Sequence, residues 1–283
     1  MSGVPATIRV YTPDRQRGLG ISAYAEMVRE LWGARELLAR FVWRDVRLRT
    51  RVAFLGLFWS MLQPLGMAAV FVYLRGSGLL RSTDEGAPYP LYVYLGILHW
   101  NLFANMITHA SGSLVGASNL VAKVAFPREV LVLSGCARAG FDWLCGLPAL
   151  IGLFIWYGYA PHAAILLAPL ALLPLVLVGV GLGLLLSVVA LPVRDVIQAL
   201  PIVLLPCLFL TPVLYALPDA GAWALLDALN PIASALNELR ALAFAGAPHD
   251  PLRWALWTLG ALLLLLAAWR FFRVLMTRVP EYA

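Results

Sequence analysis

The sequence predicts an all-α integral membrane protein with six transmembrane helices. Six apolar segments are each long enough to cross a bilayer core, which is about 30 Å thick and needs roughly 20 apolar helical residues. They cover residues 53–74, 91–110, 130–157, 163–190, 196–215 and 254–272. The composition agrees, because 61% of the residues are hydrophobic and only 13% are charged. A water-soluble core does not need so many uninterrupted apolar runs.

Positive charge is concentrated on one side of these segments. Sixteen of the 21 Lys and Arg residues lie before the first segment, in the loops after the second and fourth, or in the tail. The opposite loops hold four Arg and six acidic residues. Because cytoplasmic loops carry an excess of Lys and Arg, both termini are expected in the cytosol. The net charge of +6 then reflects topology and attraction to anionic membrane lipids, and no nucleic-acid partner is expected.

The first 52 residues are expected to form a cytosolic tail and an amphipathic helix at the membrane surface. Residues 1–22 are polar, contain no apolar signal-peptide core, and precede a helical stretch over about 24–51. Arg40, Arg44, Arg47 and Arg51 recur at spacings that place them on one face of that helix. Such a helix lies flat on the membrane. It either anchors the chain by its charge or moves as a gate beside a pore.

Several residues inside the segments predict departures from regular, apolar helices. Pro64 in the first segment and three prolines in the fifth (Pro201, Pro206 and Pro212) indicate distorted helices. Three glycines in the fourth segment (Gly179, Gly181 and Gly183) permit close helix approach. Arg138 and Asp142 share one face of the third segment, where ionisable groups are costly unless paired or wetted. They either pair within the helix or line a polar pathway.

The segment 216–247 is expected to dip back into the outer leaflet as two short helices. Residues 223–244 are too broken to cross, with the break at Asn230-Pro231. Backbone of this kind is tolerated in a membrane only where protein or a water-filled cavity surrounds it. The segment therefore predicts a pore mouth on the outer side.

The chain carries no recognisable catalytic or metal-binding motif. Its one lysine, Lys123, is followed by Val124 and is not preceded by the glycines of a phosphate-binding loop. The three cysteines and four histidines are scattered without metal-ligand spacing. We therefore expect no enzyme activity, no metal and no cofactor in this chain. If the protein performs transport, the energy comes from a partner.

The loop between the second and third segments, residues 111–129, is the most distinctive polar stretch. It ends with Phe126-Pro127-Arg128-Glu129, in which we expect an exposed aromatic anchor inside a charged rim. This stretch is either a docking surface for a partner or an ordinary turn at the membrane edge, since proline begins a helix well.

An ordered series of short motifs resembles the membrane subunit of an ABC-2 type ABC exporter, in the branch that exports polysaccharides. The resemblance covers nearly the whole chain, with a minor departure at Thr211, where serine is common. Its motifs are 35–38 with 44–46, 55–59 with 63–65, 88–92 with Gly96 and Trp100, 119–121 with Lys123 and 126–129, 194–196, 211–213 with Tyr215, and 229–231.

The resemblance implies two copies of this chain assembled with two copies of a separate ATPase that binds ATP and Mg²⁺. It implies a coupling site to the ATPase at Asn119, Lys123, Phe126, Pro127, Arg128 and Glu129. It implies a cytosolic gate at Arg40, Arg44, Asp45, Arg47 and Arg51. It implies an outer gate that includes Tyr215, Asn230 and Pro231.

A channel lined partly by aromatic side chains is also implied. Sugar rings present apolar C–H faces that stack on aromatic rings, and candidates in the first two segments are Trp59, Tyr73, Tyr92, Trp100 and Phe103. The alternative is an aromatic belt, because Trp and Tyr also gather at membrane interfaces.

The expected protein is thus a permease that passes a lipid-linked polysaccharide, O-antigen or similar, out of the cytosol across a bacterial inner membrane. Its parts are the cytosolic region 1–52, the transmembrane domain 53–272 and a cytosolic tail 273–283. The alternatives are an ABC-2 exporter of a drug or lipid, and a membrane-embedded transferase.

Overall fold

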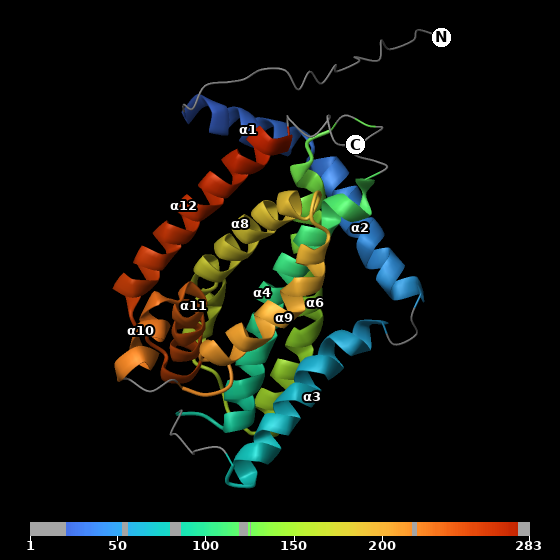
Figure 1. Cartoon of the computed structure of the whole chain (residues 1–283). Coiled ribbons are helices and arrows are strands. Elements are labelled where there is room, and N and C mark those ends of the chain that lie inside the picture. Colours follow the sequence, from blue (N-terminus) through green and yellow to red (C-terminus); the bar gives the residue numbers. More distant parts are fainter. Residues whose placement is uncertain are drawn as a thin grey trace.

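The computed structural model describes residues 21–52, 56–79, 86–118, 124, 126–216 and 220–276, and every regular element in these ranges is a helix (Figure 1). The all-α prediction is therefore confirmed for the described residues. The longer helices are α3 (Gly56–Gly76), α4 (Tyr89–Gly116), α6 (Glu129–Trp156), α8 (Leu173–Val189), α9 (Asp195–Leu210) and α12 (Pro251–Met276). The shorter ones are α1 (Ile21–Gly33), α2 (Arg35–Val52), η1 (Ala163–Leu167), α7 (Ala168–Ala171), α10 (Gly221–Leu229), α11 (Pro231–Arg240) and the π-helical η2 (Ala241–Ala245).

Three helical segments of the described chain are long and apolar enough to cross a membrane. They are residues 129–156, 163–189 and 251–276, and α9 is apolar but shorter. These helices make the chain a multi-pass membrane protein. Crossings by α3, α4 and α9, which would complete the six, stay a prediction. Helices α3 and α4 exceed 20 residues but carry polar side chains, including Gln63 and Asn101.

Helix α4 is the centre of the bundle and packs against α3, α6 and α8. All ten residues from 91 to 100 are buried. Glycines allow the neighbouring helices to come close: a Cβ on Gly135 of α6 would lie 2.8 Å from the backbone oxygen of His109, and one on Gly183 of α8 would lie 2.6 Å from the Cβ of Ala110. The expectation of close approach in the fourth segment is confirmed at Gly183.

The bundle has two ends that differ in content (Figure 1). The α1 end holds α1, α2, the start of α6 and the end of α12. The α11 end holds α10, α11, the start of α4 and the end of α9. The single helix expected over 24–51 is two helices, because the chain turns at Ala34, next to Gly33. Helix α1 lies across the α1 end, and α2 slopes away from it.

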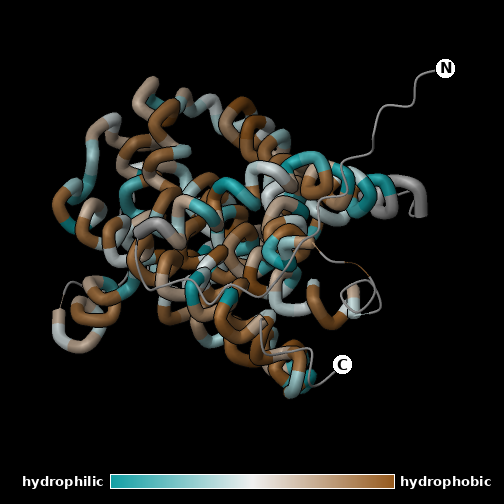
Figure 2. Tube along the Cα trace, turned by 90° about the horizontal axis from the view of Figure 1, so that it is seen from above, coloured by the Kyte–Doolittle hydropathy of each residue, from teal (hydrophilic) through white to brown (hydrophobic). Residues whose placement is uncertain are grey.

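Apolar side chains also cover much of the outside of the bundle. Figure 2 shows hydrophobic residues spread widely over the described chain, and Ile155, Ile202 and Leu263 are among the large exposed ones. Faces of this kind suit lipid or another protein rather than water.

Candidate functional site

The end of the predicted coupling loop packs into the α1 end of the bundle. Asn119 and Lys123 lie outside the described residues. Phe126 is 9% exposed and packs on Phe41 of α2, with ring centroids 6.1 Å apart. The expectation that Phe126 forms an exposed anchor is therefore wrong. Packing against α2 removes the apolar ring of Phe126 from water, and this stabilises the fold. An isolated ring on the surface would not contribute this stabilisation.

Helix α6 begins at Glu129, just after Pro127 and Arg128, and the side chains of Arg128 and Glu129 join it to α12. Pro127 is half-buried, and Arg128 is the N-cap residue. The guanidinium of Arg128 donates through Nη1 to the backbone oxygen of Met276, at 2.9 Å, on the last residue of α12. The carboxylate of Glu129, 3% exposed, accepts from Trp269 Nε1 at 3.1 Å and from Arg273 Nε.

Arg273 extends this contact to a third helix, because its Nη1 also donates to Glu30 of α1. Glu30, Arg273 and Glu129 thus form an ionic joint between α1, α12 and α6. Breaking a buried pair by removing one partner costs about 3–5 kcal/mol, since the other charge is left without compensation. Sequence reasoning missed Glu30, Trp269 and Arg273, because contacts between helices that are far apart in sequence leave no local spacing pattern.

The predicted cytosolic gate residues lie along α2. Arg44 donates to its neighbour Asp45 at 2.9 and 3.0 Å, and its guanidinium lies 4.9 Å from the ring of Phe41. Arg47 lies over Trp43 in the same way, at 4.8 Å. Arg40 is exposed, and the side chain of Arg51 lies outside the described residues. Through Phe41, the gate helix therefore touches the coupling loop at Phe126.

The five aromatic candidates for a channel lining are not brought together. Trp59 and Tyr73 on α3 are 55% and 74% exposed, whereas Tyr92, Trp100 and Phe103 on α4 are buried inside the bundle. Tyr92 instead accepts a hydrogen bond from Arg240, and Trp100 packs on Phe103. The structure gives these three α4 aromatics a packing role, and of the five only Trp59 and Tyr73 present an open ring.

The α11 end contains the two short helices expected on either side of Asn230. The side chain of Asn230 caps α11, accepting from the backbone N–H groups of Ile232 at 2.9 Å and Ala233 at 3.3 Å. Its Nδ2 donates to Thr211 Oγ1 at 2.8 Å, which fixes the end of α9. Pro231 occupies the first turn of α11, where a missing N–H is harmless.

Tyr215 and the ion pair between Asp227 and Arg253 hold the chain after α9 and helix α10 in place. The Tyr215 hydroxyl donates to the backbone oxygen of Phe209, at 2.8 Å. Asp227 of α10 pairs with Arg253 of α12 at 2.7 Å, and Trp257 Nε1 donates to the backbone oxygen of Ala228 at 3.0 Å. Helix α10 is therefore fastened to α12. Whether this segment re-enters a bilayer stays a prediction.

Arg240, counted from the sequence as a charge in an outer loop, is instead buried inside the α11 end. It is 5% exposed, its guanidinium lies 3.6 Å from the ring centroid of Tyr92, and Nη1 donates to the Tyr92 hydroxyl at 2.9 Å. It also donates to the backbone oxygens of Pro212 and Val213, where the chain leaves α9. A Cβ on Gly96 would lie 2.4 Å from Arg240 Nη2, so glycine is needed there.

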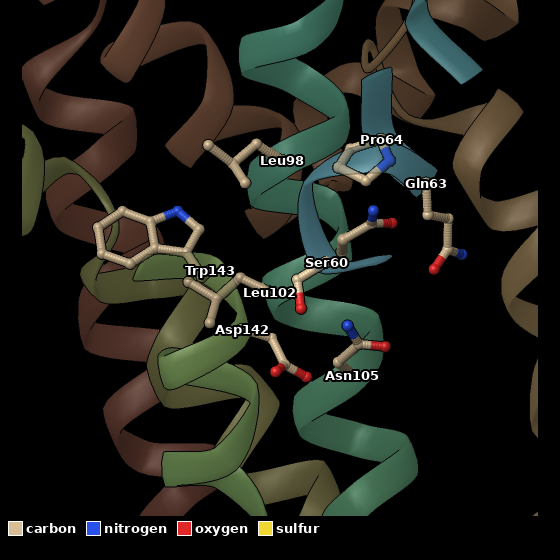
Figure 3. A pocket seen from close by; sticks show the side chains of 9 residues that line it. Ser60, Gln63, Pro64, Leu98, Leu102, Asn105, Asp142 and Trp143 are labelled. Carbon is tan, nitrogen blue, oxygen red and sulfur yellow. The ribbon is translucent and has the colours of Figure 1, made fainter. Parts of the chain in front are cut away.

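A small polar cavity of about 40 Å³ lies between α3, α4 and α6 (Figure 3). Its polar lining is Ser60 and Gln63 of α3, Asn101 and Asn105 of α4, and Asp142 of α6, with Trp143 at one wall. Ser60, Asn105 and Asp142 point toward one another in Figure 3. Asp142 Oδ2 lies 3.8 Å from His109 Nε2 on α4. Whether Asp142 pairs within α6 or lines a polar pathway stays a prediction. The sequence signal that located this region was the pair Arg138 and Asp142.

The three long apolar helical segments of the described chain define a multi-pass membrane protein. The family model for "ABC-2 type transporter" matches residues 36–244, so the chain belongs to the ABC-2 type transporter family.

Curated relatives carry a more specific description. The chain is 28% identical over 221 residues to the O-antigen export system permease protein RfbA of Myxococcus xanthus, covering 77% of this chain and 84% of that protein. It is 26% identical over 215 residues to the O-antigen export system permease protein RfbA of Klebsiella pneumoniae, covering 75% of this chain and 81% of that protein.

Proposed function

We propose that this chain is the membrane-spanning permease subunit of an ABC exporter that moves a lipid-linked polysaccharide, such as O-antigen, out of the cytosol. The observation that carries the proposal is the family match over residues 36–244, together with relatives named O-antigen export permeases. A bundle whose described helices are held by packing and by contacts at its two ends supports a transport role.

The driving force is ATP hydrolysis by a separate ATPase subunit, which holds the ATP and Mg²⁺. The segment 111–129, which comprises the last turns of α4 and the loop that leads to α6, docks on that subunit at the α1 end, which we assign to the cytosol with both termini. The basic residues of α1 and α2, with Arg128, Arg194, Arg270 and Arg273, belong to this end, in agreement with the positive-inside rule. Because Phe126 and Glu129 are buried, the docking surface itself comprises the preceding part of the loop, including Asn119 and Lys123.

The α2 helix acts as the cytosolic gate. Movement of the coupling loop reaches α2 through the Phe126–Phe41 contact, and reaches α12 and α1 through Glu129 and Arg273. The α11 end forms the outer gate, with α10 and α11 re-entering the outer leaflet. Six helices, α3, α4, α6, the segment ending in α8, α9 and α12, cross the bacterial inner membrane.

Two copies of the chain form the conduit, and α3 and α9 supply the face between them. Both helices expose large apolar side chains, such as Val70 on α3 and Ile202 on α9. Gln63 is also exposed on α3, and a polar side chain at this depth favours a wet or protein-covered face over lipid.

Deleting the gene in its host tests the proposal. Finished polymer is expected to accumulate on the cytosolic side and to return to the surface when the gene is restored. A deletion strain that leaves the polymer unfinished would indicate a transferase instead, and one that exports polymer normally would contradict the proposal. Export of a drug or lipid is the second candidate, and loss of that cargo's export with normal polymer would favour it.

A further inference from the structure

The polar cavity between α3, α4 and α6 lies at the level of the bilayer midplane, where polar groups are most costly. Asn101 and Asn105 are near the midpoint of the 28-residue helix α4, and Asp142 is near the midpoint of the 28-residue helix α6. At 1.5 Å per residue, the middle of such a helix is about 20 Å from either end. Polar and ionisable groups at this depth are costly and mark pathways for polar cargo.

The chemistry of the lining suits a ligand rich in hydroxyl groups. Asn and Gln amides both donate and accept hydrogen bonds, and an ionised Asp accepts them. Trp143 closes one wall with its indole ring, and its buried Nε1 points away from the polar side chains (Figure 3). The lining thus offers donors and acceptors side by side, which matches the hydroxyl groups of a sugar and not the acyl chain of a lipid.

The size of the cavity limits what can enter it. A volume of about 40 Å³ is close to the space of a single water molecule, and far below the several hundred Å³ of a small-molecule site. It admits one hydroxyl or hydroxymethyl group and no sugar ring. Gln63 is exposed on the α3 side of the cavity. A polysaccharide that moves past that side can therefore place one substituent at a time against the cavity. Such a weak contact lets the polymer pass and does not hold it in place.

We propose that this cavity is a glycan-contact site at the membrane midplane, where Gln63 and Asn105 exchange hydrogen bonds with hydroxyl groups of the passing polysaccharide. The inference rests on the proposed function and adds the route: the polymer passes the α3 side of α4 and α6. It differs from the aromatic lining expected from the sequence, since the contacts at this depth are polar.

Site-specific photocrosslinking in polymer-producing cells tests the route. A benzophenone amino acid replaces Gln63 in one variant and Leu263, exposed on the far helix α12, in the matched control. After irradiation, the chain is purified and probed for covalently attached polymer. We expect polymer on the position-63 variant and none on the position-263 variant. Absence of polymer at position 63, or equal labelling at both positions, overturns the inference.

Substitution of Asn105 tests the contact itself on the complete exporter. Asn105→Leu keeps the size of the side chain and removes its hydrogen bonds, so the initial rate of surface appearance should fall about three- to tenfold, the equivalent of one lost hydrogen bond. Asn105→Ser should retain more of the rate. Equal amounts of chain in the membrane and equal co-purification with the ATPase control for folding.

The outcomes separate this inference from the proposed function. If Asn105→Leu exports at the wild-type rate while deletion of the gene abolishes export, the glycan-contact site is wrong and the permease function stands. If deletion of the gene leaves polymer export intact, the permease function itself is wrong.

Discussion

Each end of the bundle is built around one arginine, Arg240 buried and Arg273 partly buried, but the two arginines have different partners. At the α11 end, Arg240 donates to the backbone oxygens of Pro212 and Val213 and to the Tyr92 hydroxyl. At the α1 end, Arg273 donates to two carboxylates, Glu129 and Glu30, on two other helices. Backbone oxygens hold their places within a rigid segment, whereas side-chain carboxylates on separate helices can part. The comparison indicates a fixed α11 end and an adjustable α1 end, next to the loop that we propose docks on the ATPase.

The largest expected effect is on folding, at the α11 end. Arg240→Leu removes the donor from the backbone oxygens of Tyr92, Pro212 and Val213 and from the Tyr92 hydroxyl, and each buried unsatisfied group costs about 1–3 kcal/mol. The melting temperature in detergent and the amount of chain in the membrane should both fall sharply. Arg240→Lys should be intermediate, because lysine lacks the planar fork that reaches several oxygens. An unchanged melting temperature for Arg240→Leu would show that the hydrogen bonds of Arg240 are not needed for stability.

The second effect is on coupling, at the α1 end. Arg273→Met leaves the buried Glu129 without its charged partner, at a cost of about 3–5 kcal/mol, and removes the ion pair between α1 and α12. We expect the complex with the ATPase to form while polymer export falls far more than ATP hydrolysis. Arg270→Met, on the same helix, is the matched control. If ATP hydrolysis and polymer export fell to the same extent, the ionic joint would not be the element that transmits motion.

A smaller effect is expected where the gate helix meets the coupling loop. Phe41→Ala removes the ring that packs on Phe126, at a cost of about 2–4 kcal/mol for a ring at the edge of the core. Export should drop severalfold, and Phe41→Leu should restore most of it because the apolar contact is retained. Export rates in whole cells, normalised to the amount of chain, measure this. Equal export by Phe41→Ala and by the wild type would show that the Phe41–Phe126 contact does not transmit motion to α2.

The smallest effect is expected at the cap of α11. Asn230→Ala removes two capping bonds and the contact to Thr211, for a loss of about 1 kcal/mol. The melting temperature should fall by a few degrees, and export should continue, since Arg240 still holds the end of α9. Asn230→Asp should recover the cap. Complete loss of export by Asn230→Ala would mean that Asn230 acts in gating beyond its structural role.

Local patterns in the sequence were enough to predict the long helices and one break between short helices. Apolar runs located the long helices, and Asn230-Pro231 located the break between α10 and α11, because both signals depend on neighbouring residues. The break at Ala34 was missed, since the basic face of α2 continues an amphipathic pattern through it.

The partners of the charged residues could not be predicted from the sequence. The side chain of Arg240 turns inward to α4, and Phe126 packs on α2, through contacts between helices far apart in the chain. Charge patterning identifies the side of the membrane that a loop occupies, but it does not show whether a given side chain faces water or the bundle. The sequence analysis counted Arg240 among the arginines of the outer loops and expected Phe126 to be exposed, and both side chains are buried.

The central claim is that this chain is a conduit powered by a separate ATPase, and reconstitution tests it most directly. The purified chain is placed in vesicles with lipid-linked polymer and ATP, alone or together with the ATPase subunit, and the polymer that reaches the far side is measured. The account predicts transfer only when both subunits are present, and no ATP hydrolysis by this chain alone. Uphill transfer or ATP hydrolysis by the isolated chain would contradict it.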